Sequence, residues 1–190
     1  MPIWVNVPNG LTLLRLLLAP LVIEAILSGR AMLAFVLFVT AAWTDVLDGA
    51  AARRWGSGTR VGAYLDPIAD KCLMSGVFVA LAWAHRVPWW AVGIILGRDV
   101  YILLAAVAMM QFVSIRNFPP SVWGKLSTFA QIVTVGVWMG RDLFQLEVLD
   151  AFSRAMLWVC VALAVWSGIH YTARAARVLA KGSPYGGNQP

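Results

Sequence analysis

The chain has 190 residues, of which 61% are hydrophobic and only 13% are charged, and its formal net charge is +6. An ordinary soluble domain carries about 25% charged and about 45–50% apolar residues, so this composition excludes an ordinary soluble protein. A membrane span takes about 20 apolar residues, and the chain has room for about six. We expect one membrane domain over residues 1–180 and a disordered tail over residues 181–190.

Six apolar stretches alternate with short polar interruptions and predict an all-α, polytopic membrane protein with six transmembrane helices. We expect these helices over residues 11–27, 31–52, 64–84, 88–113, 122–139 and 151–173. Asp66 and Pro67 are expected in the first turn of the third helix, which suits both residue types. Residues 141–150 are expected to form a polar loop. Cys72 and Cys160 lie in apolar stretches, so we expect two buried thiols and no disulfide.

The basic residues are divided unequally between the two sides that six spans would create. The side that holds both termini carries ten Lys and Arg residues and the other side four, while Arg98 lies within a span. Cytoplasmic loops are enriched in Lys and Arg, so we expect both termini at the cytoplasmic face. Attraction to anionic lipid headgroups explains the positive net charge better than a nucleic-acid partner does.

Four aspartates lie where the second and third apolar stretches approach each other in the chain: Asp45, Asp48, Asp66 and Asp70. A carboxylate within a membrane span costs about 2.5–3.5 kcal/mol, so four of them need a strong reason. Residues three or four apart share a helix face, and the short loop between the helices predicts antiparallel neighbours whose carboxylate pairs face each other. Mg²⁺ prefers such oxygen ligands, together with substrate phosphates. The alternative is that the acids pair with nearby Arg and Lys side chains.

Small residues and an arginine are interleaved with these acids. Gly49, Ala52 and Gly62 would let a ligand or another backbone approach closely. Arg53 follows the first acid pair and could hold a pyrophosphate through bidentate contacts. Taken singly, the small residues are better explained by helix packing and Arg53 by anchoring at the membrane surface.

The spacing Asp45-x2-Asp48-Gly49-x2-Ala52-Arg53-x8-Gly62-x3-Asp66-x3-Asp70 resembles the signature of the CDP-alcohol phosphotransferases, which are integral membrane enzymes of phospholipid synthesis. Every position of the signature is present. Residues 6–15 look like the opening of bacterial phosphatidylglycerophosphate synthases and of eukaryote-type cardiolipin synthases, and residues 66–71 are similar to both. Gly124-Lys125-Leu126-Ser127-Thr128, with Gln131, is similar to a later segment of these enzymes.

The resemblance implies six transmembrane helices, usually a homodimer, and a polar cavity that opens to the cytoplasm of a bacterial inner membrane. It implies transfer of a phosphatidyl group from CDP-diacylglycerol to a glycerol-type alcohol, with release of CMP. Mg²⁺ or Mn²⁺ is the expected ion. The implied metal ligands are Asp45, Asp48, Asp66 and Asp70, with Asp70 also the general base. The implied CDP-binding residues are Gly49, Ala52, Arg53 and Gly62.

Arg98 and Lys125 are the candidate residues for binding an acidic acceptor. An arginine in mid-span is a functional candidate by default, although it could instead pair with Asp48, Asp70 or Asp99. Lys125 opens the fifth helix, where its side chain could equally snorkel to the interface.

The acceptor itself is less clearly indicated. Phosphatidylglycerophosphate synthases usually have Arg-Glu in the fourth helix with another Arg two turns later, whereas this chain has Arg98-Asp99 and Ala106. Arg-Asp looks more like the cardiolipin synthases, which use phosphatidylglycerol. Residues 59–63 look closer to the glycerophosphate enzymes, so we favour glycerol-3-phosphate. A cation transporter remains a distant alternative, because acids along a transport path would be spread over several spans.

Overall fold

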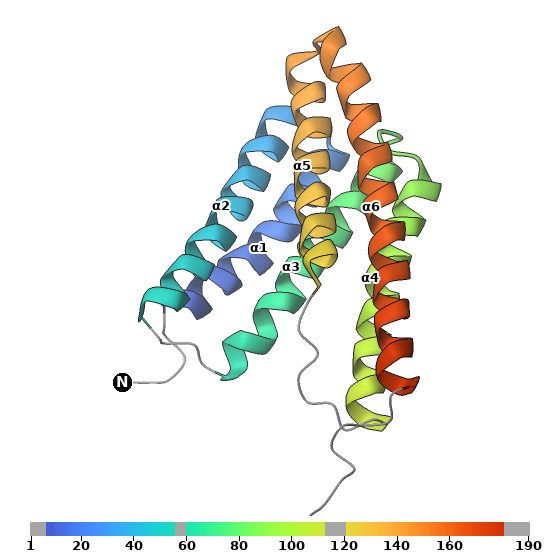
Figure 1. The fold of residues 1–190 in the computed structure, drawn as a ribbon. Coiled ribbons are helices and arrows are strands. Elements are labelled where there is room, and N and C mark those ends of the chain that lie inside the picture. Colours follow the sequence, from blue (N-terminus) through green and yellow to red (C-terminus); the bar gives the residue numbers. More distant parts are fainter. Residues whose placement is uncertain (1–6, 56–59, 113–120, 181–190) are drawn as a thin grey trace, which may run out of the picture.

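The computed structural model describes the backbone of residues 7–55, 60–112 and 121–180 and the side chains of residues 13–44, 71–105 and 121–177 (Figure 1). The described residues form helices and no strand, which confirms the all-α class. The described residues form six helices: α1 (Val7–Leu27), α2 (Ala31–Trp55), α3 (Arg60–Trp83), α4 (Trp89–Phe112), α5 (Val122–Phe144) and α6 (Glu147–Ala180). The predicted tail, residues 181–190, lies outside the described part of the chain.

Several predicted helix boundaries are wrong. Helix α3 begins at Arg60, so Pro67 lies beyond its first turn. The predicted polar loop over residues 141–150 shrinks to two residues, because α5 continues to Phe144 and α6 begins at Glu147. The physical reason is that helical hydrogen bonding continues through polar residues that an apolar window excludes.

The chain turns between α5 and α6 at Gln145. This residue adopts a left-handed backbone conformation with φ 51°, and its N–H donates to the carbonyl oxygen of Arg141 at 2.9 Å. That bond satisfies one of the free carbonyls at the end of α5. Glu147 and Asp150 lie in the first turn of α6, where the helix dipole stabilises negative charge. The polar composition of this segment therefore marks helix ends rather than a loop.

The helices pack in a connected bundle (Figure 1). Helix α1 contacts both α2 and α3, α5 contacts α2 and α6, and α4 packs mainly on α6. Helices α2 and α3 run in opposite directions, as predicted, but their described contacts run through α1 rather than directly between them. The predicted approach of α2 and α3 concerns their aspartate-bearing ends, whose side chains lie outside the described ones, so it stays a prediction. The buried core includes Val22, Phe38, Val77, Phe78, Ile95, Val135, Cys160 and Ala164.

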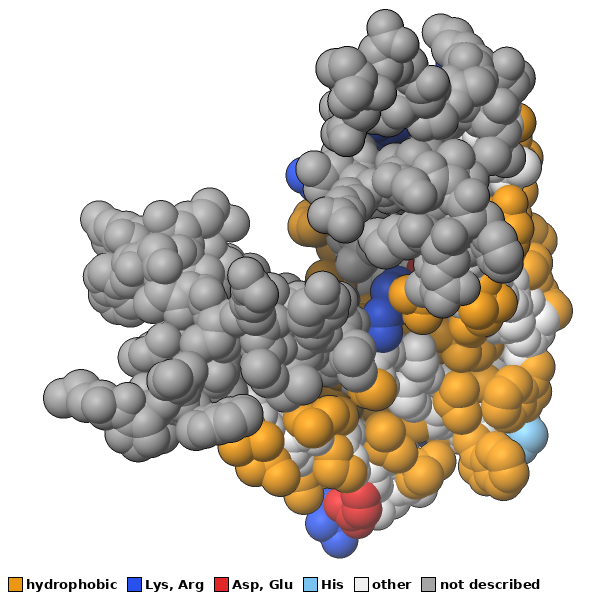
Figure 2. Space-filling view, turned by 90° about the horizontal axis from the view of Figure 1, so that it is seen from below, with side chains coloured by type: hydrophobic (Ala, Val, Ile, Leu, Met, Phe, Trp, Pro, Cys, Tyr) orange, Lys and Arg blue, Asp and Glu red, His pale blue; other side chains and the backbone are white. Residues whose placement is uncertain are grey.

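The outer surface of the described bundle is strongly apolar. Leu103 and Leu104 on α4 are each 62% exposed, and Trp158 on α6 is 63% exposed. Seen from one end, hydrophobic side chains dominate the described surface, and Lys and Arg side chains reach it in few places (Figure 2). Soluble monomers rarely expose apolar surface of this extent. The bundle is therefore built for apolar surroundings.

One of the described helices is long and apolar enough to cross a bilayer, over Glu147–Arg177. Shorter apolar helical stretches are found at Ala31–Thr44 and Lys71–Trp83. Cys160 is buried as expected, whereas Cys72 is exposed, which corrects the prediction for that residue. Its apolar sequence context reflects an outward-facing position on an apolar bundle rather than a place in the core.

Helices α1 and α3 approach closely at Gly76. A Cβ atom at this position would lie 2.6 Å from the Cδ1 atom of Ile23. We expect Gly76→Leu to lower the free energy of unfolding by about 1–3 kcal/mol, the usual cost of overpacking. The measurement is thermal unfolding in detergent. Gly136→Leu is the matched control, since no neighbouring atom lies within 4 Å of a Cβ there. Equal melting temperatures for the two variants would contradict the close approach.

Candidate active site

The signature residues lie on two helix ends. Helix α2 carries Asp45, Asp48, Gly49, Ala52 and Arg53 in its last turns, and α3 carries Gly62, Asp66 and Asp70 in its first turns. The backbone is helical at every one of these positions, so the spacing of each aspartate pair places it on one helix face. Their side chains lie outside the described ones. The described side chains alone contain no group of three potential metal ligands.

A charged cluster follows directly after the signature, one residue beyond Asp70. The Nζ atom of Lys71 on α3 lies 2.6 Å from Oδ2 of Asp99 on α4. The other oxygen of Asp99, Oδ1, accepts a hydrogen bond from Nη1 of Arg98 at 2.6 Å. Both oxygens of one carboxylate are thus occupied by cations from two helices. Of the three partners predicted as alternatives for Arg98, the structure shows Asp99.

The cluster is buried unevenly. The side chains of Arg98 and Asp99 are only 8% and 6% exposed, whereas that of Lys71 is 42% exposed. Buried charges of this kind persist only when they are paired and hydrogen-bonded. Lys71 is therefore the member of the cluster that a ligand can reach from outside.

Helices α5 and α6 complete the surroundings of Arg98. Its Nη2 atom donates to the hydroxyl of Ser167, which is fully buried on α6. A Cβ atom at Gly124, near the start of α5, would lie 3.6 Å from the same Nη2 atom. A small residue at position 124 thus leaves room for the guanidinium. The Nε atom of Arg98 is buried without a hydrogen-bond partner among the described atoms.

Further buried polar residues lie on α1, α2 and α5. Arg15 on α1 is 1% exposed, Gln131 on α5 is 1% exposed, and Thr44 on α2 lies one residue before Asp45. Burying such groups costs free energy unless they are hydrogen-bonded, and the Thr44 hydroxyl donates to the carbonyl oxygen of Ala41 at 2.7 Å. Lys125 is exposed in the first turn of α5, so the structure does not bring it into the buried cluster.

The sequence of residues 5–166 matches the family model of the CDP-alcohol phosphatidyltransferases. The chain belongs to this family. The match covers the signature, the Lys71–Asp99–Arg98 cluster and most of α6 up to Trp166. CDP-alcohol phosphatidyltransferases generally use a divalent metal, and the carboxylates on α2 and α3 are ligands of the type that such ions bind.

Named relatives of this phosphatidyltransferase fall into two groups. A probable phosphatidylglycerophosphate synthase of Mycobacterium tuberculosis is 35% identical over 179 residues, which cover 90% of this chain and 82% of the relative. The CDP-diacylglycerol–glycerol-3-phosphate 3-phosphatidyltransferase of Escherichia coli is 32% identical over 176 residues, which cover 90% of this chain and 94% of the relative. A probable CMP-forming cardiolipin synthase of Drosophila melanogaster is 31% identical over 175 residues, which cover 83% of this chain and 53% of the relative.

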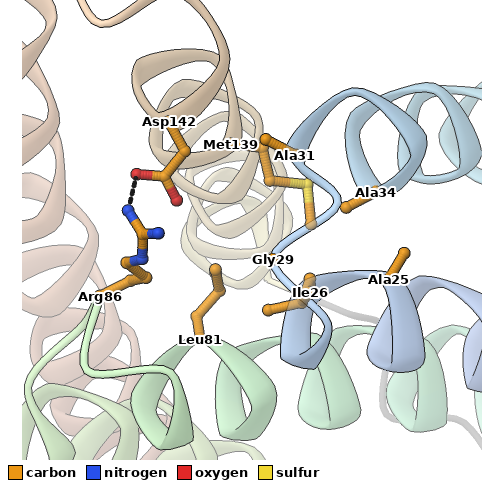
Figure 3. Close-up of a pocket in the computed structure, with 9 residues that line it drawn as sticks. All are labelled: Ala25, Ile26, Gly29, Ala31, Ala34, Leu81, Arg86, Met139 and Asp142. Carbon is orange, nitrogen blue, oxygen red and sulfur yellow. Dashed lines mark hydrogen bonds and ion pairs between the residues drawn. The ribbon is translucent and has the colours of Figure 1, made fainter.

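The opposite end of the bundle holds a second set of ion pairs. Nη1 of Arg86, in the turn after α3, lies 2.7 Å from Oδ1 of Asp142 on α5 (Figure 3). Arg141 pairs with Asp150 of α6 beside it. These pairs join helix ends far from the signature.

Sequence reasoning missed three residues of the candidate site. From the sequence, Lys71 is predicted only as a possible ion-pair partner of the aspartates, although its position directly after Asp70 indicates a place in the site. Asp99 is predicted only as one of three possible ion-pair partners of Arg98. Ser167 gave no signal, because a lone serine in an apolar helix is common, and its contact with Arg98 bridges 69 positions in the chain.

Proposed function

We propose that the protein transfers the phosphatidyl group of CDP-diacylglycerol to glycerol-3-phosphate and releases CMP. The observation that carries this choice is the cluster beyond Asp70, where Lys71 and Arg98 share the single carboxylate of Asp99. Among the described side chains of this cluster, two cations face one carboxylate, which leaves the cluster itself with a net positive charge. Such a site favours an acceptor that carries its own phosphate. The names of the bacterial relatives support the same acceptor.

The carboxylates of the signature are the proposed metal ligands. Asp45 and Asp48 on α2, with Asp66 and Asp70 on α3, would hold Mg²⁺ or Mn²⁺, which suits an all-oxygen donor set. When bound there, such an ion would neutralise charge on the phosphates of the donor. The CDP moiety is assigned to the residues interleaved with the acids: Gly49, Ala52, Arg53 and Gly62.

Asp70 is the proposed general base. Its carboxylate accepts the proton of the acceptor hydroxyl, the hydroxyl oxygen forms a bond to the phosphorus that carries diacylglycerol, and the bond from that phosphorus to the oxygen of CMP breaks. CMP leaves with the electron pair of the broken bond. Lys71 directly follows Asp70 on α3, so one cation of the cluster and the proposed base belong to the same helix segment.

Arg98 is the proposed anchor for the acceptor phosphate. Its Nη groups are held by Asp99 and Ser167, and its Nε donor has no described partner. A fixed guanidinium with a free donor is suited to a phosphate oxygen. Lys125, exposed at the start of α5, would meet the acceptor on its way in.

A second candidate activity is cardiolipin synthesis with phosphatidylglycerol as acceptor. The pair Arg98-Asp99, with Ala106 two turns later, favours it. The similarity to the Drosophila cardiolipin synthase points the same way. Phosphatidylglycerol also carries a phosphate, but as a diester with about one negative charge, so it makes weaker use of the cation cluster than glycerol-3-phosphate does.

We further propose that all six helices span the inner membrane of a bacterium and that the enzyme is a homodimer. The apolar exterior of the described bundle supports the spans. The excess of Lys and Arg on the side of the termini supports a cytoplasmic location of both termini and of the site. There a lipid donor can enter from the membrane while a soluble acceptor arrives from water.

The test is to identify the lipid product. Purified protein in detergent is given CDP-diacylglycerol and Mg²⁺ with either labelled glycerol-3-phosphate or labelled phosphatidylglycerol. We expect labelled phosphatidylglycerophosphate from the first mixture and little cardiolipin from the second. Cardiolipin as the main product would replace the proposed activity by the second candidate.

A further inference from the structure

Asp99 is the most deeply buried carboxylate among the described residues that bridge helices. Its side chain is 6% exposed, and its two oxygens contact Lys71 of α3 and Arg98 of α4, each at 2.6 Å. Through Arg98 the contacts extend to Ser167 of α6. One carboxylate thus connects three helices at the level just beyond the signature.

The cations that Asp99 holds retain unused donors. A lysine ammonium has three donors and a guanidinium has five. Asp99 takes one from Lys71 and one from Arg98, and Ser167 takes another from Arg98. The Nε of Arg98 is buried without a described partner, and Lys71 is 42% exposed. The pairing therefore fixes both cations while leaving donors for an anion.

Fixing Lys71 has a consequence for the adjacent base. A lysine side chain is a flexible stem that samples many rotamers when it is exposed and unpaired. The α carbons of Lys71 and Asp70 are about 3.8 Å apart as chain neighbours. Holding the Lys71 ammonium on Asp99 therefore determines where an anion bound to it lies relative to the residue that is to receive the acceptor proton.

We propose that Asp99 is a positioning residue: it holds Lys71 and Arg98 together as one binding site for the phosphate of the acceptor. Lys71 is a contact residue of this site, next to Asp70. The inference rests on the proposed function, since that function supplies the phosphate-bearing acceptor. It adds Lys71 and Asp99 to the residues that determine acceptor use and gives them different roles.

The first test is Asp99→Asn, with Asp99→Glu as the conservative variant. Asparagine keeps the shape but presents an NH₂ group to one of the two cations. We expect the KM for glycerol-3-phosphate to rise about tenfold or more, while the KM for CDP-diacylglycerol changes by less than about twofold. Asp99→Glu restores the negative charge and should recover most of the acceptor KM. An equal rise in both KM values would overturn the positioning role.

The second test is a double-mutant cycle with Lys71→Met. If Asp99 acts partly through Lys71 and partly through Arg98, the double variant should lose less use of glycerol-3-phosphate than the product of the two single losses predicts. Independent contributions would instead multiply the two losses. Multiplied losses would show that Asp99 does not work through Lys71.

Asp142→Asn controls for the loss of any buried ion pair. Asp142 is 14% exposed and bound to Arg86 at 2.7 Å, at the opposite end of the bundle. We expect this variant to lower the melting temperature in detergent but to leave the KM for glycerol-3-phosphate unchanged. If Asp99→Asn merely repeated this pattern, Asp99 would be a structural residue only.

Binding without turnover separates this inference from the proposed function. Thermal stabilisation of the metal-loaded protein is measured against glycerol-3-phosphate in the absence of donor. We expect Asp99→Asn to need about tenfold more ligand for the same stabilisation, whether or not the wild-type protein turns over. Equal stabilisation of wild type and variant would overturn the inference. Failure of wild-type turnover with intact binding would instead overturn the proposed function.

Discussion

Asp70→Asn is expected to abolish turnover while leaving the binding of CDP-diacylglycerol largely intact. Asparagine has nearly the same volume, but it cannot accept the proton of the acceptor hydroxyl. Loss of a general base ordinarily lowers kcat by about 10²- to 10⁴-fold. The measurement pairs the rate of CMP release with the affinity for CDP-diacylglycerol, both for the purified variant in detergent.

Asp150→Asn is the control for Asp70→Asn. Asp150 pairs with Arg141 at the far end of the bundle, so its loss tests the effect of removing a carboxylate from a helix end. We expect near-normal turnover for this variant. Near-normal turnover of Asp70→Asn itself would rule out Asp70 as the base. Loss of donor binding in Asp70→Asn would show that its main role is to hold the metal.

Arg98→Ala should impair use of the acceptor more than binding of the donor. The substitution removes the guanidinium that Asp99 and Ser167 hold in place, and with it the unpaired Nε donor. A charge-assisted hydrogen bond contributes about 1.5–3 kcal/mol, which corresponds to an increase of the KM for glycerol-3-phosphate of about 10- to 150-fold. The measurement is the KM of each substrate at a saturating concentration of the other.

Arg86→Ala is the matched control for Arg98→Ala, because Arg86 also pairs with an aspartate at a comparable distance. It should leave both KM values unchanged. If Arg98→Ala lowered only the yield of folded protein, as Arg86→Ala could, the guanidinium would have a structural role. Arg98→Lys keeps the charge but loses the forked geometry, so we expect a KM between those of wild type and Arg98→Ala.

Much of the fold could be predicted from the sequence because apolar length and polar interruptions are local signals. The six helices follow from them, and α2 begins at Ala31 as predicted. The α5–α6 boundary could not be found in this way. It depends on the left-handed backbone at Gln145 and on the favourable placement of Glu147 and Asp150 at the start of α6.

The residues of the candidate site likewise divide into those that a local sequence pattern predicts and those that depend on tertiary contacts. The aspartate signature is a fixed local spacing, so the sequence reveals it at once. The Lys71–Asp99 pair and the contact of Arg98 with Ser167 are tertiary, and they join α3, α4 and α6. No local pattern specifies which of several acids an arginine in mid-span will meet. Exposure on an apolar bundle is equally non-local, which is why Cys72 was misplaced in the core.

The most direct test of the central claim is CMP release by the purified wild-type protein with CDP-diacylglycerol, measured with and without Mg²⁺ and with and without glycerol-3-phosphate. Metal-dependent transfer to a phosphate-bearing acceptor predicts rapid CMP release only when Mg²⁺ and glycerol-3-phosphate are both present. Chelation of the metal should stop CMP release, and adding Mg²⁺ again should restore it. Release that needs neither Mg²⁺ nor an acceptor would contradict the assignment of the four aspartates and of the Lys71–Asp99–Arg98 cluster.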